Sequence, residues 1–163
     1  MDLKRLSKDA VPGALAKAER YRLLNEPVMA ESICLDILAV EPDDQEALVT
    51  TILAITDQFG TDAGQHMARA QELIPRLTDE YARAYYGAII TERRARARIS
   101  AGSPSLARDW LLEALRGFDR ALALRPAGND DAILRWNACV RTLERLPAAA
   151  QPLDAGDAVI LSE

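Results

Sequence analysis

Apolar residues recur every three or four positions along most of this chain, the spacing of an amphipathic helix. A first stripe begins after Pro12 and a second after Pro27. Proline suits the first position of a helix, because its missing N–H needs no partner there. The second stripe consists of Ala30, Ile33, Cys34, Ile37 and Leu38. The pattern predicts a pair of antiparallel helices that ends near Pro42.

The next stretch predicts a second, less regular pair of helices. Asp43 and Glu46 have the spacing of a capping box, and the helix they begin should end at Gly60. Thr61 or Asp62 is expected to cap the partner helix, which ends before Pro75. The apolar stripe of the first of these helices consists of Leu48, Ile52, Ile55 and Phe59.

A longer pair follows, with its only internal turn signal at Gly102-Ser103-Pro104. We expect helices over residues 79–101 and 104–124, with Ser103 as the N-cap of the second. Each is about two turns longer than usual, so this pair should project ~12 Å beyond its neighbours. Asn129 is expected to cap a last helix from Asp130 to about Leu146.

These patterns predict an all-α fold of six to seven stacked antiparallel helices without a sheet. Residues 1–11 form an N-terminal arm, 12–146 a helical domain, and 147–163 a flexible C-terminal tail. The apolar triplet Val159-Ile160-Leu161 either docks on a groove or stays disordered. The residues expected in the core are Tyr21, Ala30, Ile33, Ile37, Leu48, Ile52, Ile55, Leu115, Phe118 and Trp136.

The first pair resembles a tetratricopeptide repeat, whose ~34-residue pattern has conserved small and aromatic positions. Tyr21, Ala30 and Pro42 keep the intervals of that pattern, with Ala18 at its small position and Cys34 at its Phe position. The same second-helix signature recurs later in the chain, once with one residue deleted and once at its proper intervals. These two matches are Ala63, Met67, Ala70 and Pro75, and then Ala114, Phe118, Ala121 and Pro126.

The resemblance implies about three degenerate repeats of bacterial type, stacked as an α-solenoid with a long third hairpin and a C-terminal capping helix. In this family the first helix of each hairpin lines a concave face that binds protein partners. The family's clamp for C-terminal carboxylates is absent, because its Lys and Asn positions here hold Leu15, Glu19, Val49 and Leu53.

Composition narrows the class of protein. The chain of 163 residues is 49% hydrophobic and 5% aromatic, which suits helices closed by small residues. Cys34 and Cys139 fall within helical patterns and are expected to be buried thiols. The first residues lack a signal-peptide core, and no stretch approaches the ~18 apolar residues that a membrane span needs. These features predict a cytoplasmic protein without a membrane partner.

Catalytic chemistry has no support in the sequence. The chain has a single histidine, His66, and no glycine-rich phosphate loop, so we expect no enzyme, no cofactor and no metal site. Asp43-Asp44 and Asp130-Asp131 lie at predicted helix starts, where the helix dipole explains them.

Charge is distributed unevenly. The net charge is −5, yet residues 23–68 contain no Lys or Arg. Arg93, Arg94, Arg96, Arg98 and Arg108 lie around the predicted turn at Gly102 without an acidic residue among them. They form either a solvated helix face, with Glu92 and Arg96 as an i,i+4 pair, or a contact for an anionic partner. An acidic protein suits the second alternative better than nucleic acid, because this negative chain would repel phosphate.

The resulting hypothesis is a non-catalytic adaptor that binds a protein segment or a second copy of itself. The alternative is a chaperone for secreted proteins, of the tetratricopeptide type found in type III secretion. Head-to-tail contact between the acidic block, residues 23–68, and these arginines would be abolished by exchanging Arg94 and Arg98 for Glu. We expect this exchange to leave the fold intact, because both arginines are placed on a wet face. Candidate contact residues are Arg83, Tyr86, Arg93, Arg94, Arg98, Arg108, Trp110, Thr50 and Asp57.

Overall fold

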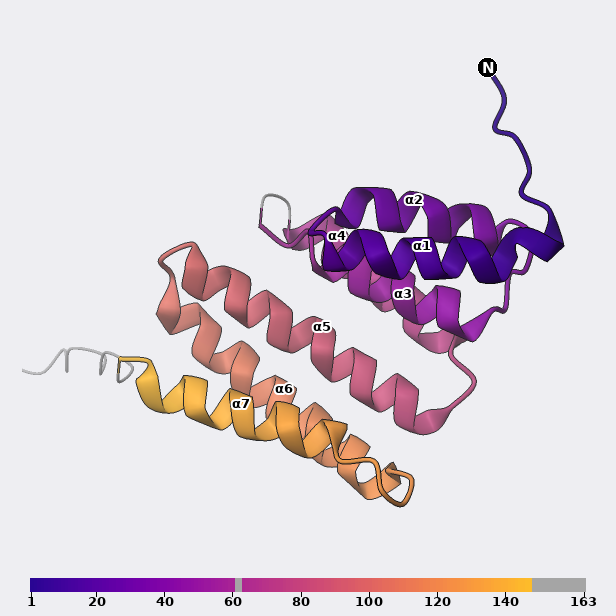
Figure 1. Cartoon of the computed structure of the whole chain (residues 1–163). Helices are drawn as coiled ribbons and strands as arrows, with labels where there is room; N and C mark the ends of the chain where they lie inside the picture. The colour runs from indigo at the N-terminus through magenta and orange to yellow at the C-terminus, as the bar shows by residue number, and fades with distance from the viewer. Residues whose placement is uncertain (61–62, 148–163) are drawn as a thin grey trace, which may run out of the picture.

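The computed structural model describes residues 1–60 and 63–147, and these residues form helices and turns without a strand (Figure 1). The predicted all-α class is confirmed. The helices are α1 (Val11–Leu23), α2 (Pro27–Leu38), α3 (Gln45–Thr56), α4 (Ala63–Leu73), α5 (Glu80–Ser100), α6 (Pro104–Leu124) and α7 (Asp131–Arg145). Short 3-10 turns at Lys8–Ala10 and Ile74–Arg76 precede α1 and follow α4.

Local chemistry explains where the helices begin. Proline occupies the first turn of α1, α2 and α6, as the sequence predicts. Asp79 caps α5, because its carboxylate accepts a hydrogen bond from the Ala82 N–H at 3.0 Å. The prediction that Asp43 caps α3 is wrong by one residue: Asp44 accepts from the Ala47 N–H at 2.8 Å. The caps proposed at Thr61 or Asp62 lie outside the described residues.

Two other predicted caps differ in detail. Ser103 is the N-cap residue of α6, but its side chain makes no capping hydrogen bond. The N-cap of α7 is Asp130 and not Asn129. Asn129 contributes from one residue earlier, where its side-chain oxygen accepts from the Asp131 N–H at 3.0 Å. It also accepts from the Tyr81 hydroxyl at 3.2 Å, which joins the start of α7 to α5.

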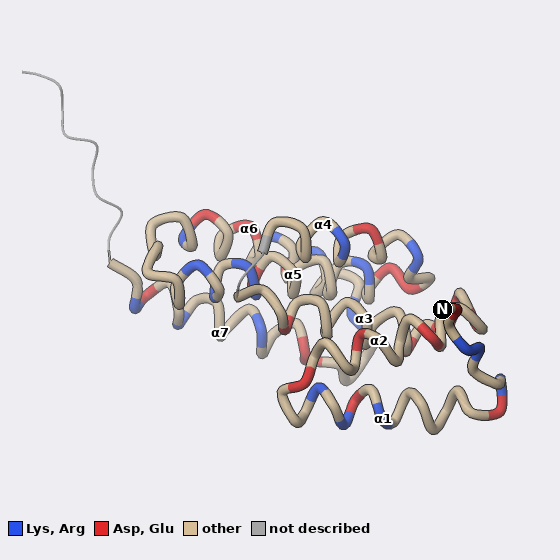
Figure 2. The backbone as a smooth tube through the Cα atoms, turned by 90° about the horizontal axis from the view of Figure 1, so that it is seen from above, with Lys and Arg blue, Asp and Glu red and all other residues tan. Residues whose placement is uncertain are grey.

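Each helix packs against the next one in the chain, and α3 also contacts α1 and α5 (Figures 1 and 2). The core is therefore divided into layers between neighbouring helices. One layer joins α3, α4 and α5, and another joins α5, α6 and α7. Two smaller clusters join α1 and α2 to α3. Each helix therefore buries its apolar stripe mainly against helices that are close to it in the sequence.

Six of the ten residues predicted for the core are buried, and the other four are buried only in part. Ala30, Ile37, Leu48, Ile52, Ile55 and Phe118 are buried, whereas Tyr21, Ile33, Leu115 and Trp136 are only half-buried. The four half-buried residues lie in the first hairpin or in α6 and α7. These elements have a neighbouring helix on fewer sides than α3 and α5, so their side chains keep part of their exposure.

The long pair α5–α6 has the predicted bounds to within one residue, and its helices have 21 residues each. Its turn is not a free-standing tip, because α7 packs along α6. The Arg108 guanidinium in α6 donates to the carbonyl oxygens of Leu146 and Pro147, at 3.4 and 3.0 Å. The expectation that this pair projects beyond all of its neighbours is therefore wrong for α7, whose end contacts Arg108 near the turn.

No helix in the described part of the chain is both long enough and apolar enough to cross a bilayer. The proposed docking of Val159-Ile160-Leu161 lies outside the described residues, as does the rest of the predicted tail beyond Pro147.

Phe118 fills the layer between α5 and α6 and has no exposed surface. Its ring lies 5.9 Å from that of Tyr85, centroid to centroid. Phe118→Ala should lower the free energy of unfolding by about 3–5 kcal/mol, because it removes a buried ring and leaves a cavity. Urea unfolding followed by circular dichroism measures the change. A loss below about 1 kcal/mol would contradict the packing described for this layer.

Gly117 marks the closest approach of α6 to α5. A Cβ atom added there would lie 2.7 Å from the Cβ of Ala88, whereas one added at Gly87 in α5 meets nothing within 4 Å. Gly87→Ala should stabilise the protein by up to about 1 kcal/mol through helix propensity. Gly117→Ala should destabilise it by about 1–2 kcal/mol, because overpacking outweighs the same propensity gain. Thermal unfolding of both variants tests the contrast, and equal stabilisation would exclude the close approach.

Candidate functional site: a groove with two charged ends

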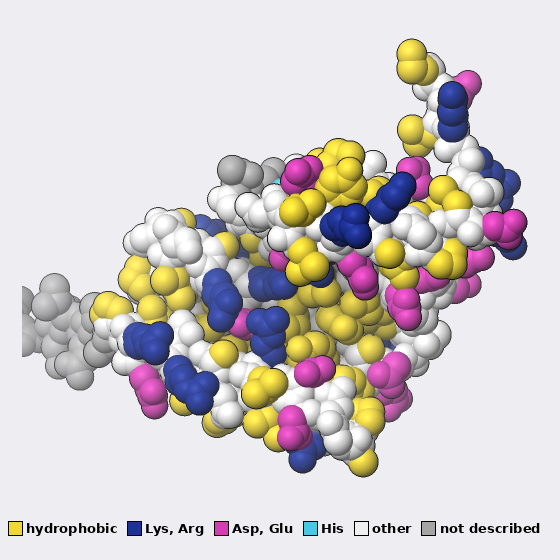
Figure 3. All heavy atoms as spheres, in the orientation of Figure 1, with side chains coloured by type: hydrophobic (Ala, Val, Ile, Leu, Met, Phe, Trp, Pro, Cys, Tyr) yellow, Lys and Arg dark blue, Asp and Glu magenta, His cyan; other side chains and the backbone are white. Residues whose placement is uncertain are grey.

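A groove runs between α1 and α3 on one side and α5 and α7 on the other. Figure 3 shows this face hollowed, with Lys and Arg side chains gathered at one end and acidic side chains around the other. Two hollows lie along it, both lined by α3, α5 and α7. The first, here called the arginine pocket, has a volume of about 580 Å³. The second, the tyrosine pocket, has a volume of about 360 Å³.

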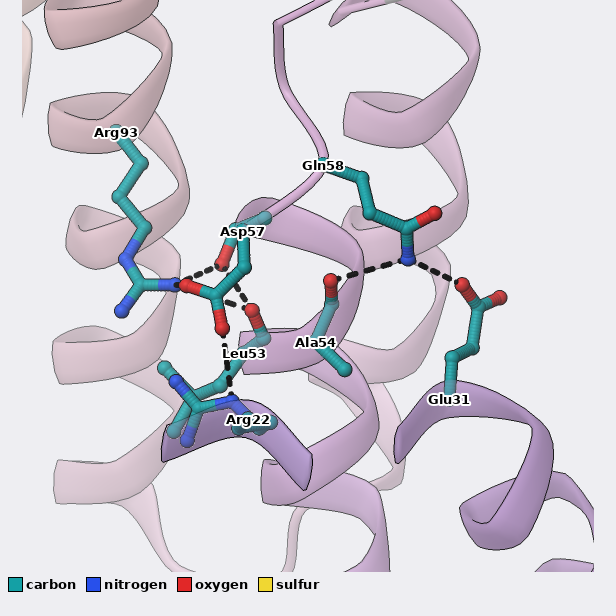
Figure 4. Close-up of polar contacts among 8 residues, drawn as sticks. Arg22, Glu31, Leu53, Ala54, Asp57, Gln58 and Arg93 are labelled. Atoms are coloured by element: carbon teal, nitrogen blue, oxygen red, sulfur yellow. Dashed lines mark hydrogen bonds and ion pairs between the residues drawn. The ribbon is translucent and has the colours of Figure 1, made fainter. Parts of the chain in front are cut away.

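Asp57 at the end of α3 joins three helices beside the arginine pocket (Figure 4). Its carboxylate accepts from the Arg22 Nε of α1 at 2.9 Å and from the Arg93 guanidinium of α5. Arg93 also donates to the Leu53 carbonyl at 3.0 Å and the Thr56 hydroxyl at 2.7 Å. Arg93 therefore satisfies polar groups at the C-terminal end of α3, where the helix dipole favours a cation.

A second carboxylate is shared in the same way. Glu92 of α5 is 1% exposed, and its two oxygens lie 3.2 Å from Arg96 and 3.5 Å from Arg135 of α7. A charge this deeply buried requires opposite charges nearby. Burial lowers the pKa of Arg135, but Glu92 and Tyr85 together raise it above its ordinary value. Arg135 thus stays cationic where α7 faces the groove.

The arginine pocket collects the guanidinium groups held by these two carboxylates. Arg93, Arg96 and Arg135 line it together with Asp57, and Phe59 and Ala97 add apolar surface. Burial lowers the pKa of Arg93, and the nearby charges of Arg22 and Arg135 lower it further, against the influence of Asp57. The like charges therefore lie close enough to repel one another, and the pocket is a place for an anionic group.

The tyrosine pocket has the opposite charge. It is lined by four acids and three tyrosines, and no Lys or Arg is among its lining residues. Tyr85 stacks on Tyr81 at 5.5 Å and meets Tyr86 edge to face at 5.1 Å, centroid to centroid. Burial is the main cause that raises the pKa of all three, that of Tyr81 to about 12, so the phenols are neutral at ordinary pH. The acids are Glu19, Glu46, Asp79 and Asp131.

A second buried carboxylate, Glu31, lies on the side of α3 away from the groove. Glu31 of α2 accepts from the Gln58 amide at 2.7 Å (Figure 4). It also pairs with Arg69 of α4. Gln58 also donates to the Ala54 carbonyl at 3.1 Å. This network joins α2, the end of α3 and α4 on the side of α3 away from α5, and so fixes the end of α3 that carries Asp57.

The structure brings four of the predicted contact residues to the groove. Arg93 and Asp57 lie in the arginine pocket, and Thr50 and Tyr86 lie in the tyrosine pocket. Of these, Arg93 and Asp57 bind each other, so part of their charge is used within the chain. Tyr86 is half-buried, and so is its neighbour Tyr85.

The other predicted contact residues lie elsewhere. Arg94 lies over the Trp110 ring at 4.1 Å and contacts the Met67 sulfur. It is half-buried and not on a wet face, so the expected harmless exchange of Arg94 for Glu is wrong. Arg83 donates to the carbonyls of Leu77 and Thr78, Arg108 contacts the end of α7, and Arg98 lines neither pocket.

The arginine-rich run thus has several roles. The predicted pair of Glu92 and Arg96 is confirmed, but its carboxylate is buried, so the pair is not a solvated helix face. Arg135 is not among the predicted contact residues, because it comes from another helix and leaves no local signal in the sequence. The sequence showed the charges of Arg96 and of the acids of the tyrosine pocket, but it did not show that these residues line a groove. A helical wheel of each odd-numbered helix would have placed Arg96 near Arg93.

Metal and thiol chemistry has no centre in the described residues. These contain no cluster of three metal-ligating side chains, and Cys34 and Cys139 are both buried. Burial raises the pKa of Cys34 to about 11 and that of Cys139 to about 12. Both thiols therefore stay protonated, and a thiolate nucleophile is disfavoured at either position.

The link between Asp57 and Arg93 should be measurable as a coupling energy. In a double-mutant cycle of Asp57→Asn and Arg93→Gln, the first change leaves the partly buried Arg93 without its carboxylate, and the second leaves Asp57 with Arg22 alone. The coupling should be about 1–3 kcal/mol in the free energy of unfolding. The exposed pair of Glu80 and Arg83, 3.8 Å apart, is the control and should couple by less than about 0.5 kcal/mol. Equal coupling in both cycles would contradict a joining role for Asp57.

Compared with protein-family models, with curated proteins and with solved structures, the chain gave no match. The resemblance to tetratricopeptide repeats therefore stays a prediction from residue spacing. Support for the groove, and for the function proposed from it, comes from the geometry of the described residues alone.

Proposed function

We propose that this chain is a non-catalytic interaction scaffold of the tetratricopeptide type, which binds a protein segment in the groove between α1, α3, α5 and α7. The observation that carries the proposal is the groove itself, with its two pockets of opposite charge. The pairs α1–α2, α3–α4 and α5–α6 correspond to three hairpins, and α7 corresponds to a capping helix. In such an arrangement the first helices of successive hairpins form the binding face.

The chemistry of the groove favours binding over catalysis. The charged groups of the arginine pocket are engaged in ion pairs, and the two thiols of the described residues are buried. An interaction surface needs charged and aromatic groups at fixed positions, and these are supplied by rigid helices in place of loops. Tyr85 and Tyr86 add the large, rigid side chains that contribute most to binding at protein interfaces.

Site-specific photo-crosslinking in the native host tests where partners bind. A benzophenone amino acid replaces Ser100 at the arginine pocket or Glu46 at the tyrosine pocket, both exposed positions. The controls carry it at Arg116 or Arg120, exposed positions of α6 outside both pockets. We expect crosslinks to other proteins from the two groove positions and few from α6. Crosslinks confined to α6 would refute the proposed face.

A further inference from the structure

The groove carries an excess of positive charge at one end that the protein itself does not neutralise. At the arginine pocket, four guanidinium groups, those of Arg22, Arg93, Arg96 and Arg135, share two carboxylates, Asp57 and Glu92. Two positive charges remain in excess. The side chain of Arg96 is 54% exposed and that of Arg135 is 34% exposed, so both are accessible to a partner.

The arginines are held in place, which makes this a built site and not a loose cluster of charges. The Glu92 carboxylate is buried and lies between Arg96 and Arg135, within 3.5 Å of each. Arg93 is fixed by Asp57, Leu53 and Thr56 at the end of α3. A carboxylate from outside would meet guanidinium groups whose conformational freedom is already reduced, so the entropic cost of binding is lower.

The other end of the groove is built for a cation. Glu46, Asp79 and Asp131 line the tyrosine pocket, and none of them has an ion-pair partner among the described residues. Tyr85 and Tyr86 line the same pocket, and neutral aromatic faces attract ammonium and guanidinium groups. A Lys or Arg side chain of a partner would therefore gain both an opposite charge and an aromatic surface.

The distance between the two ends sets the spacing of the partner's charges. On α5 the tyrosine pocket takes residues from Asp79 to Tyr86 and the arginine pocket takes residues from Arg93 to Ala101. At ~1.5 Å per residue the centres of these segments are roughly 20 Å apart, and those on α3 roughly 15 Å. An extended chain covers ~3.3 Å per residue, so about five or six residues bridge the two pockets.

We propose, on the basis of the function proposed above, that the groove binds an extended segment of a partner protein that carries an acidic side chain and, about five or six residues away, a basic one. The acidic side chain enters the arginine pocket and the basic one enters the tyrosine pocket. Charge at both ends makes the groove directional, because a reversed segment places like charges together. A uniformly anionic ligand such as nucleic acid is disfavoured by the four acids of the tyrosine pocket.

Selection from a displayed library of random 12-residue peptides tests this chemistry with the full-length protein as bait. Enriched peptides should carry Asp or Glu in one half and Lys or Arg in the other, in one constant order. The dissociation constant of an enriched peptide is then measured by fluorescence polarisation. Arg96→Gln with Arg135→Gln should weaken it about tenfold or more, and Glu46→Gln with Asp131→Asn should do the same. Arg116→Gln with Arg120→Gln on α6 is the control and should leave it unchanged.

Matched peptides assign each charge to its pocket. Replacing the acidic residue of the peptide by its amide should weaken binding to the wild type about tenfold. The same replacement should hardly weaken binding to the Arg96/Arg135 variant any further. The same non-additivity should link the basic residue to Glu46 and Asp131. Additive losses in both cycles would overturn the assignment. Circular dichroism of each variant shows whether the fold is retained, and single substitutions replace any pair that unfolds the chain.

The remaining outcomes separate this inference from the proposed function. Peptides that bind the groove without separated charges would overturn the inference and leave the function in place. Failure of the groove variants to alter the binding of any selected peptide would overturn both. Two other occupants are also tested. A tenfold gain in peptide affinity on deleting residues 148–163, or a dimer dispersed by the arginine-pocket variants, would assign the groove to this chain itself and overturn the partner assignment.

Discussion

The Asp57 carboxylate binds guanidinium groups from two other helices at the point where α3 ends, Arg22 of α1 and Arg93 of α5. Arg93 also closes the C-terminal end of α3 by donating to the Leu53 carbonyl and the Thr56 hydroxyl. Apolar contacts between helices are tolerant of small rotations, whereas these hydrogen bonds need particular directions. The separation and rotation of α1, α3 and α5, three of the four helices around the groove, therefore depend on this one polar junction.

The same junction explains the charge of the groove. A carboxylate that pairs with two arginines leaves one positive charge in excess, and this occurs twice. Asp57 pairs with Arg22 and Arg93 of two other helices, whereas Glu92 pairs with Arg96 of its own helix and Arg135 of α7. The stabilising network and the arginine pocket are thus made of the same atoms. A substitution that weakens the network alters both stability and charge, so binding experiments need variants such as Arg96→Gln, whose side chain is more than half exposed.

Small residues set how closely the long helices can approach. Ala88, Ala95, Ala107, Ala114 and Gly117 are buried in α5 and α6, and Gly117 lies against Ala88 without room for a methyl group. Close contact along such helices allows Phe118 and Leu111 to fill the remaining space. Because α5 then extends along the whole groove, one rigid helix contributes to both pockets and keeps their distance constant.

The sequence by itself determined the helices and their order, because these follow from local chemistry. Proline at helix starts, Asp79 as a cap, the turn at Gly102 and the apolar period act within a few residues, and the predicted bounds of α5, α6 and α7 agree with the structure to within one residue. The core residues of α3 follow from the same period. The cap of α3 was misplaced because Asp43 and Asp44 are adjacent acids, and only the backbone angles decide between them.

Only the tertiary structure decided what each arginine does. In the sequence, Arg93, Arg94, Arg96 and Arg98 are alike, since all lie in one helix among alanines. Their partners come from distant parts of the chain: Asp57 for Arg93, and Trp110 and Met67 for Arg94. Arg135 reaches Glu92 from α7 and becomes a groove residue in the same way. A long, flexible cation takes its role from whatever lies within its reach, and which groups lie within reach is set by the packing of helices.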